Sequence, residues 1–281
     1  MNNFIFKNDI LKGKVAFITG GATGIGNGIA RQMARAGADI VIASRTREKC
    51  EKAATELAAE FGIKARGYGM DVRESAQVNR TMKAAVDDMG SLDILVNNAA
   101  GNFYFPAKKL RDRLWNAVID IDLNGTFYCC RAAYKYLKEN GGTIISISAT
   151  LQHNGWVGMA HAASAKAAID TLTKTLALEW GRDQIRVNAI APGPVHTEGV
   201  AKAFEMGGDF ADWQNSIPLK RAGRPEEVGN MAVFMASEAG SWMTGSIVVL
   251  DGGEVLSARR AGIDPEQLDD LLKNRLKEKK G

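Results

Sequence analysis

The chain has 281 residues, of which 46% are hydrophobic and 24% charged, and its formal net charge is +4. This composition predicts one large folded domain and excludes a disordered chain, and no apolar run reaches the roughly 18 residues that a membrane-spanning helix needs. The positive charge is too small and too scattered for a nucleic-acid-binding surface, so we expect neither nucleic acid nor a membrane as partner.

Residues 1–13 form a predicted N-terminal extension with lysines among polar residues and without the apolar core of an export signal. The last five residues, KEKKG, differ from a Ser-Lys-Leu peroxisomal address, so we expect a cytoplasmic protein. Cys50, Cys129 and Cys130 show no metal-binding spacing and are expected to be buried, reduced thiols. We therefore predict no metal site.

Short apolar runs alternate with longer helical patterns over residues 14–254. Seven runs predict strands, at Val15 to Ile18, Ile40 to Ala43, Ala65 to Met70, Ile94 to Val96, Ile144 to Ile147, Val187 to Ile190 and Ile247 to Leu250. Crossover helices are predicted between them, for example at Gly24 to Ala36, Glu48 to Phe61, Glu74 to Met89 and Ser164 to Trp180. We predict a single α/β domain with a doubly wound, parallel, seven-stranded sheet of the Rossmann type, which binds ligands beyond the carboxyl ends of its strands.

A glycine-rich turn follows the first predicted strand and leads into a helix. Glycines let such a turn close tightly and bring backbone N–H groups up to a pyrophosphate, while the helix N-terminus adds partial positive charge. The residues expected to bind a dinucleotide here are Gly20, Ala22, Thr23, Gly24, Ile25 and Gly26.

The end of the second strand indicates which dinucleotide binds. An NAD site usually has a carboxylate here for the ribose 2′-hydroxyl, whereas this chain has Arg45. The planar guanidinium suits a 2′-phosphate, so we predict NADPH as the cofactor; the alternative is a solvent-facing arginine.

The third and fourth predicted strands end on further candidate cofactor contacts. Asp71 and Val72 are placed to meet the adenine, and Asn98 and Ala99 to lie against the cofactor. Asparagines at strand ends also cap backbone groups, so both roles stay open for Asn98.

Together these and later motifs resemble the short-chain dehydrogenase/reductase family from about Lys14 to Gly253. The later motifs are Asn124, Lys166, Pro192-Gly193 with Thr197, and Thr244-Gly245 with Asp251-Gly252-Gly253. By this resemblance, Lys166 binds the nicotinamide ribose and Asn124 orders a water. The same resemblance implies further cofactor contacts from Pro192, Gly193, Val195 and Thr197.

Two side chains of that family's active site are missing. Counting back from Lys166, alanines stand where the family has its tyrosine and its serine, at Ala162 and Ala149. Reduction of an isolated ketone leaves an alkoxide that needs a nearby proton donor, which those two residues normally supply. A conjugated thioester instead spreads the charge as a dienolate that is protonated later on carbon, and this chemistry can proceed without the tyrosine.

Several local stretches are similar to the 2,4-dienoyl-CoA reductases, especially the peroxisomal type and its bacterial relatives. These stretches are Asn98 to Phe103, Asp120 to Thr126, Ser148 to Leu151, His161 to Ala168 and Ala191 to Pro194. The similarity implies NADPH-dependent reduction of 2,4-dienoyl-CoA to 3-enoyl-CoA during the breakdown of unsaturated fatty acids, by a homo-oligomer, typically a tetramer.

The same similarity implies a catalytic role for Asp122, which would position or protonate the water that delivers a proton. The alternative is a carboxylate at a helix start that accepts backbone N–H groups. The mitochondrial type has a tyrosine in the loop before the lysine helix, but this chain has none between Ile147 and Lys166, so the proton donor is left open.

The acyl-CoA substrate is expected to contact Arg73, Asn102, Phe103 and Tyr104, with loop packing and a solvated charge as the alternatives. The segment from Pro192 to about Pro218 is interpreted as a substrate lid, or else as an ordinary surface excursion. His161 is expected to pack at the start of the lysine helix. Residues 255–281 are predicted to be a basic, helical C-terminal extension.

The sequence thus predicts an NADPH-dependent 2,4-dienoyl-CoA reductase. The alternatives are another short-chain reductase acting on 2-enoyl or 3-oxoacyl thioesters, and an inactive NADPH-binding regulatory protein.

Overall fold

A single parallel β-sheet forms the centre of the molecule in the computed structural model, which describes residues 5–197 and 214–257. Its strands are β1 (Val15–Thr19), β2 (Asp39–Ser44), β3 (Ala65–Gly69), β4 (Ile94–Asn97), β5 (Gly142–Ile147), β6 (Ile185–Pro192) and β7 (Ile247–Leu250). They lie in the order β3-β2-β1-β4-β5-β6-β7, and every pair is parallel. The predicted seven-stranded, doubly wound sheet is confirmed.

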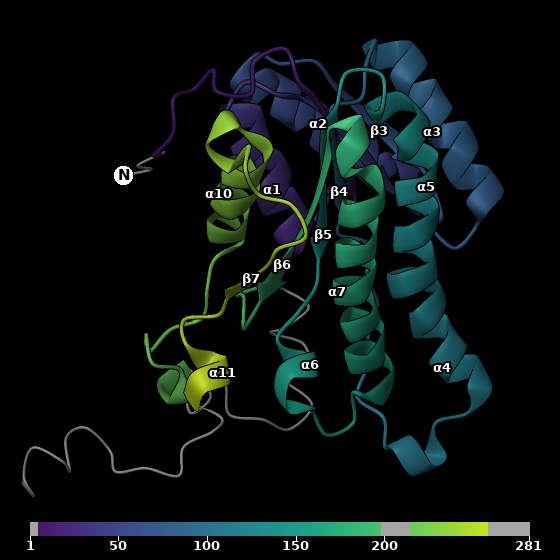
Figure 1. Ribbon diagram of the computed structural model, residues 1–281, viewed down its shortest axis with the longest axis vertical. Helices are drawn as coiled ribbons and strands as arrows, with labels where there is room; N and C mark the ends of the chain where they lie inside the picture. The colour runs from purple at the N-terminus through teal and green to yellow at the C-terminus, as the bar shows by residue number, and fades with distance from the viewer. Residues whose placement is uncertain (1–4, 198–213, 258–281) are drawn as a thin grey trace, which may run out of the picture.

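Helices cover both faces of this sheet (Figure 1). The α-helices are α1 (Gly24–Arg35), α2 (Arg47–Phe61), α3 (Ser75–Met89), α4 (Asp112–Ile119), α5 (Gly125–Leu137), α6 (Leu151–Asn154), α7 (Ala160–Trp180), α10 (Pro225–Ala236) and α11 (Glu254–Ser257). The short 3-10 helices are η1 (Ala107–Lys109), η3 (Gly181–Asp183) and η4 (Glu238–Gly240), and η2 (Asp120–Asn124) is a π-helical turn.

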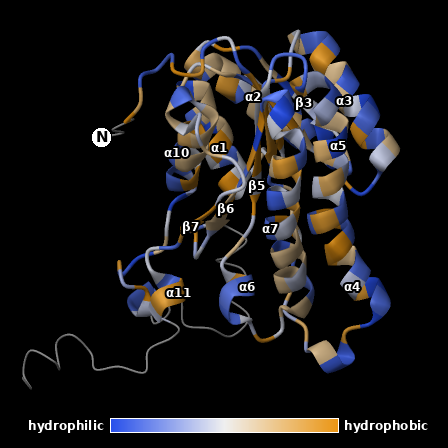
Figure 2. Ribbon diagram, viewed as in Figure 1, coloured by the Kyte–Doolittle hydropathy of each residue, from blue (hydrophilic) through white to orange (hydrophobic). Residues whose placement is uncertain are grey.

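The sheet separates two hydrophobic cores. One core joins the strands to α1, α2 and α10, and the other joins them to α3, α5 and α7. Because both faces are covered, the central strands are continuous apolar runs in the sequence. All five residues of β1 are buried. Figure 2 shows this hydrophobic colouring along the strands between the helical layers.

The direction of winding reverses between β1 and β4. Ala16 of β1 pairs with Ile40 of β2 on one side and with Ile94 of β4 on the other. The chain therefore leaves the sheet after β3 and returns on the far side of β1, which opens a crevice at the carboxyl ends of these strands.

The helix that carries Lys166, α7, begins at Ala160, which is four residues before its predicted start at Ser164. Its N-cap residue, Met159, makes no side-chain cap hydrogen bond, so the sequence holds no start signal at this position. The longer helix places Ala162 inside its first turn.

Part of the predicted N-terminal extension belongs to the core. Leu11 is only 1% exposed, packs in the core that includes α1, and its N–H donates to the Ala36 carbonyl at 2.8 Å. Most of the predicted lid and nearly all of the predicted C-terminal helix lie outside the described residues. Within the described ranges, no helix combines the length and apolarity needed to cross a membrane.

Candidate active site

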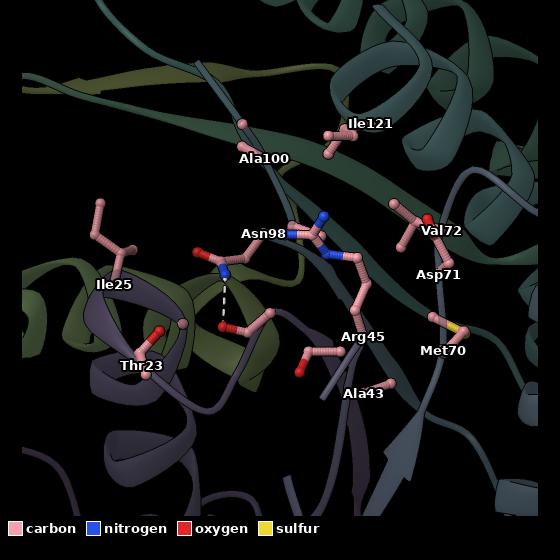
Figure 3. Close-up of a pocket in the computed structure, with 15 residues that line it drawn as sticks. Thr23, Ile25, Ala43, Arg45, Met70, Asp71, Val72, Asn98, Ala100 and Ile121 are labelled. Atoms are coloured by element: carbon pink, nitrogen blue, oxygen red, sulfur yellow. Dashed lines mark hydrogen bonds between the residues drawn. The ribbon is translucent and has the colours of Figure 1, made fainter. Parts of the chain in front are cut away.

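A cavity of about 340 Å³ opens at the carboxyl ends of β1, β2, β3 and β4 (Figure 3). Its lining residues come from the glycine turn, the three following strand ends and η2: Gly20, Thr23, Ile25, Gly26, Ala43, Ser44, Arg45, Met70, Asp71, Val72, Asn98, Ala99, Ala100, Gly101 and Ile121. Nine of the predicted cofactor residues are among them: Gly20, Thr23, Ile25, Gly26, Arg45, Asp71, Val72, Asn98 and Ala99. The position is the one expected for a doubly wound sheet.

The glycine turn is shaped by close backbone approaches. Gly20 has φ +65°, a conformation that glycine adopts without a Cβ clash. A Cβ on Gly26 would lie 2.4 Å from the Asn98 side-chain nitrogen and 2.4 Å from the Gly20 carbonyl. The first turn of α1 carries no acidic side chain and no side-chain cap, so its partial positive charge is available to an anion.

Asn98 holds this turn in place. Its side-chain amide donates to the Thr19 carbonyl at 2.9 Å and to the Gly20 carbonyl at 3.2 Å, the bond drawn in Figure 3. The backbone N–H groups of Asn98 and Ala99 both donate to Thr19 Oγ1 at 3.0 Å. The alternative reading of Asn98 as a backbone cap is therefore confirmed, although the residue also lines the cavity.

Three charged side chains lie in or beside the part of the cavity formed by the ends of β2 and β3. Arg45 extends into it from the end of β2 (Figure 3), and Asp71 follows β3. The Arg73 guanidinium donates to both oxygens of the Asp71 carboxylate, and this hydrogen bonding lowers the pKa of Asp71 despite partial burial. Arg73, expected to reach a CoA phosphate, thus pairs here with Asp71.

A buried ion pair joins Asp122 and Lys166. Lys166 Nζ lies 3.4 Å from Asp122 Oδ2, and the two side chains are 10% and 1% exposed. The same Nζ donates to the Ile147 carbonyl at the end of β5 at 2.8 Å, and Asp122 Oδ1 accepts the Gly101 N–H at 2.9 Å. Breaking a buried pair leaves an uncompensated charge, so each partner holds the other in place.

Asp122 lies in the middle of a continuous helix. Helix α4, the π-helical turn η2 and α5 follow one another without a break from Asp112 to Leu137. Asp122 is therefore not at a helix start, but it does accept a backbone N–H as that alternative expects, from Gly101 in the loop after β4. A π-helical turn shifts side chains relative to the α-helical period and is common at functional sites.

The neighbouring polar side chains are engaged elsewhere. Asn124 Nδ2 donates to Asp120 Oδ1 at 2.8 Å. Ser148 and Thr150, which flank Ala149, donate their hydroxyls to Asp170 and Glu254. Neither hydroxyl is therefore free to replace the serine missing at Ala149. At the tyrosine position, Ala162 is 1% exposed.

The other predicted cofactor residues are not in the lining of the cavity. These are Ala22, Gly24, Lys166, Pro192, Gly193, Val195 and Thr197. The Thr197 methyl group lies 3.7 Å from the position of a Cβ on Gly24, which places the segment after β6 against the glycine turn. Val195 forms an isolated β-bridge with Gly223.

The loop after β4 carries the predicted substrate residues. Asn102 and Tyr104 are exposed, whereas Phe103 is half-buried and its ring packs edge-on against the His161 ring. His161 packs at the start of α7, as predicted. Met70 and Ile121 also line the cavity, and the sequence analysis did not single them out. In the sequence, Met70 is marked only by its position at the end of a predicted strand, and Ile121 only by its position next to Asp122.

The three cysteines are buried and free. Among the described residues, no group of three or more His, Cys, Asp or Glu side chains is arranged to hold a metal ion.

Comparisons with known proteins match reductases and dehydrogenases. The family described as Enoyl-(Acyl carrier protein) reductase matches residues 20–254. A Danio rerio protein named peroxisomal 2,4-dienoyl-CoA reductase, (3E)-enoyl-CoA-producing, is 42% identical over 279 residues, which cover 98% of this chain and 92% of the relative. A Bacillus subtilis (strain 168) protein named probable 2,4-dienoyl-CoA reductase, (2E)-enoyl-CoA-producing, is 41% identical over 87% of this chain and 97% of its own.

Solved structures show the same architecture. A short chain dehydrogenase from Bacillus anthracis is 43% identical, with a TM-score of 0.77 over 86% of this chain and 96% of its own. A putative short-chain alcohol dehydrogenase from Sinorhizobium meliloti 1021 has a TM-score of 0.83 at 31% identity, over 89% of this chain and 99% of its own.

Proposed function

Because this chain belongs to the short-chain dehydrogenase/reductase family, whose fold implies a nicotinamide cofactor, we propose that it reduces 2,4-dienoyl-CoA to 3-enoyl-CoA with NADPH. The relatives named 2,4-dienoyl-CoA reductases, at about 40% identity, support this substrate class.

One observation carries the proposal. The chain combines a buried Asp122–Lys166 ion pair with alanines, Ala149 and Ala162, at the positions where the family has its serine and tyrosine. No hydroxyl is present at those two positions to protonate an alkoxide as it forms. A conjugated thioester avoids this need, because hydride addition to the far carbon spreads the charge onto the thioester oxygen. The pocket therefore favours a substrate that carries its own electron sink.

When bound, NADPH would supply the hydride. The residues of the chain would orient the substrate, stabilise the developing negative charge and direct the proton to carbon. Lys166 Nζ, fixed by Ile147 and Asp122, would hold the nicotinamide ribose and contribute positive charge near the developing anion. Asp122, fixed by the Gly101 N–H, would position the water that returns a proton to carbon, and Asn124 would help to order it.

The cavity fits a dinucleotide phosphate. Gly20 and Gly26 let the turn pack directly against Asn98, since a Cβ on either would lie within 3 Å of the Asn98 side-chain nitrogen, and the uncapped N-terminus of α1 that follows would bind a pyrophosphate. Arg45 supplies a guanidinium where an NAD site would have a carboxylate, which supports NADPH. Asp71 and Val72 would meet the adenine, and the segment from Pro192 to Thr197 the nicotinamide end.

For the acyl-CoA, we propose that Phe103 and Tyr104 line the acyl channel with Asn102 at its rim. Arg73 would bind a CoA phosphate by leaving its ion pair with Asp71. That pair lies at the surface, and exposed ion pairs contribute little stability.

We also propose a homo-oligomer, a tetramer by analogy with the reductases it resembles. Its support is the apolar surface around β7, the edge strand of the sheet, where Trp242 is 100% and Val249 42% exposed among the described residues. Exposed edges and apolar patches are usually covered by a partner.

The test supplies the pure protein with NADPH and, in parallel, 2,4-hexadienoyl-CoA, crotonyl-CoA and acetoacetyl-CoA, and follows NADPH absorbance. We expect turnover of the dienoyl thioester at least about 100-fold above the other two, equivalent to about 2.7 kcal/mol of transition-state discrimination. Preference for crotonyl-CoA would favour the enoyl reduction that the matched family's description names. NADPH binding without turnover of any thioester would favour a regulatory protein.

The position of the product double bond needs its own measurement, because the relatives' names include both (3E)- and (2E)-enoyl-CoA-producing enzymes. Mass spectrometry and NMR of the product from 2,4-hexadienoyl-CoA should show the 3-enoyl thioester. A 2-enoyl product would contradict that part of the proposal.

A further inference from the structure

A buried histidine lies next to the Asp122–Lys166 pair. His161 is 0% exposed, sits in the first turn of α7 five residues before Lys166, and packs its ring edge-on against Phe103 with 4.6 Å between ring centres. Burial lowers the pKa of His161, while the Asp122 carboxylate and the Phe103 backbone favour a protonated ring and oppose that shift. The net lowering leaves a neutral imidazole at physiological pH.

The structure also specifies which ring nitrogen carries the proton. Nδ1 accepts the N–H of Ala162 at 2.7 Å, a bond that satisfies one of the first N–H groups of a helix without a side-chain N-cap. A nitrogen that accepts a hydrogen bond carries no proton, so the neutral ring is the Nε2–H tautomer.

The Nε2–H is then a buried donor without a hydrogen-bond partner among the described residues. An unsatisfied buried donor costs about 1–3 kcal/mol, so such a group in a native protein calls for a reason. The Phe103 backbone lies close enough to act on the ring, but the bond to it is not formed in this conformation.

The backbone that faces His161 belongs to the loop that fixes Asp122. Gly101, two residues before Phe103, gives its N–H to Asp122 Oδ1. His161 therefore links the helix that carries Lys166, to which it belongs, with the loop that holds Asp122, against which its ring packs. A shift of either element would change the geometry of the ion pair.

We propose that His161 is a positioning residue: its Nε2–H closes onto the Phe103 backbone when the acyl thioester binds, and this fixes the loop that holds Asp122. Hydrogen bonds in active sites are often long without substrate and tighten in the complex. Because it stays neutral, His161 orients the site and does not supply the proton. The inference rests on the proposed function, since an acyl thioester is the ligand that closes the site.

The test compares His161→Phe, which keeps a ring against Phe103 but removes both nitrogens, with His161→Gln, which restores an amide N–H near the position of Nε2. For His161→Phe we expect kcat with 2,4-hexadienoyl-CoA to fall about 10- to 100-fold, as for misplacement of a reacting group, with the NADPH dissociation constant unchanged within about twofold. His161→Gln should recover at least half of that loss on a logarithmic scale.

The matched control is His153→Phe, at an exposed position of α6, which should keep the kcat of the unmodified protein. Wild-type kcat in His161→Phe, or a loss that His161→Gln does not reduce, would overturn the inference. Absence of dienoyl turnover in the unmodified protein would instead contradict the proposed function, so the two failures are distinguishable.

A second measurement needs no variant. The chain has three histidines, so nitrogen NMR of the protein labelled only in histidine can be assigned residue by residue. We expect His161 to show the Nε2–H tautomer in the NADPH-bound protein, and its Nε2 signal to shift when a non-reducible acyl-CoA is added. An Nδ1–H tautomer, or an Nε2 signal indifferent to acyl-CoA, would overturn the inference.

Discussion

At the scale of single residues, the site is built around one carboxylate held by two different elements. Asp122 accepts the Gly101 N–H from the loop after β4 and pairs with Lys166 from α7, while its own backbone belongs to η2. The carboxylate is 1% exposed, so its orientation is set by these partners and hardly by water.

The first prediction concerns that carboxylate. Asp122→Asn keeps the shape but removes the charge, and it leaves buried Lys166 without its anion, so we expect kcat to fall about 100-fold or more and stability to fall by about 3 kcal/mol. The NADPH dissociation constant should change less than about threefold. Steady-state kinetics, cofactor titration and urea unfolding measure these effects, and Asp112→Asn at the exposed start of α4 is the control. Full turnover by Asp122→Asn would show that this carboxylate is only structural.

The second prediction concerns cofactor choice. Arg45→Gln removes the guanidinium that would bind the 2′-phosphate, and hydrogen bonds to charged groups contribute about 1.5–3 kcal/mol. We therefore expect the NADPH dissociation constant to rise about 10- to 100-fold while that for NADH stays within about twofold. Fluorescence titration measures both, with Arg47→Gln, two residues along and exposed, as the control. Equal effects on the two coenzymes would argue against a 2′-phosphate contact.

At the scale of elements, the proposed cofactor site depends on how closely the glycine turn, α1 and the end of β4 approach one another. Asn98 joins all three, because its side chain bonds to Thr19 and Gly20 and lies against Gly26. A run of glycines after a strand signals this approach in the sequence. Asn98 follows a strand that is far away in the sequence, and its place at a strand end indicates backbone capping without showing which backbone groups it binds.

The third prediction tests that approach. In Gly26→Ala, the added methyl group would lie 2.4 Å from both the Asn98 side-chain nitrogen and the Gly20 carbonyl, so the turn must shift. We expect a loss of about 1–3 kcal/mol in stability, typical of overpacking, and NADPH binding weakened by at least about tenfold. Calorimetry and titration measure these changes. Gly181→Ala, where a Cβ would meet nothing within 4 Å, should change neither.

At the scale of the whole molecule, the sheet is covered on both faces but ends at β7 with apolar side chains in solvent. Trp242 and Val249 are exposed here, whereas the central strands are buried. A second copy of the chain covering this edge would account for that exposure.

The fourth prediction follows from this edge. Trp242→Glu should convert the proposed oligomer to smaller species, because a charge desolvated in an apolar interface is strongly unfavourable. Light scattering after size exclusion measures the mass, and Thr55→Glu on α2, beside the opposite side of the sheet, should leave it unchanged. An unchanged mass for Trp242→Glu would place the interface elsewhere.

The sequence alone was sufficient for the parallel sheet, its seven strands and the glycine turn after β1, because these depend on local patterns. Apolar runs, helical periodicity and the glycine turn at Gly20 to Gly26 each express a short-range requirement, and the sheet confirms them. The absence of hydroxyl groups at Ala149 and Ala162 can also be recognised from the sequence alone.

Only the tertiary structure placed Asp122 against Lys166 and Gly101, and His161 against Phe103, because these contacts join segments that no periodicity relates. It also showed that Asp122 lies inside a π-helical turn and not at a helix start. Burial and charge pairing arise when distant elements pack together, so the polarity of the reaction site is a property of the fold and not of any one stretch of sequence.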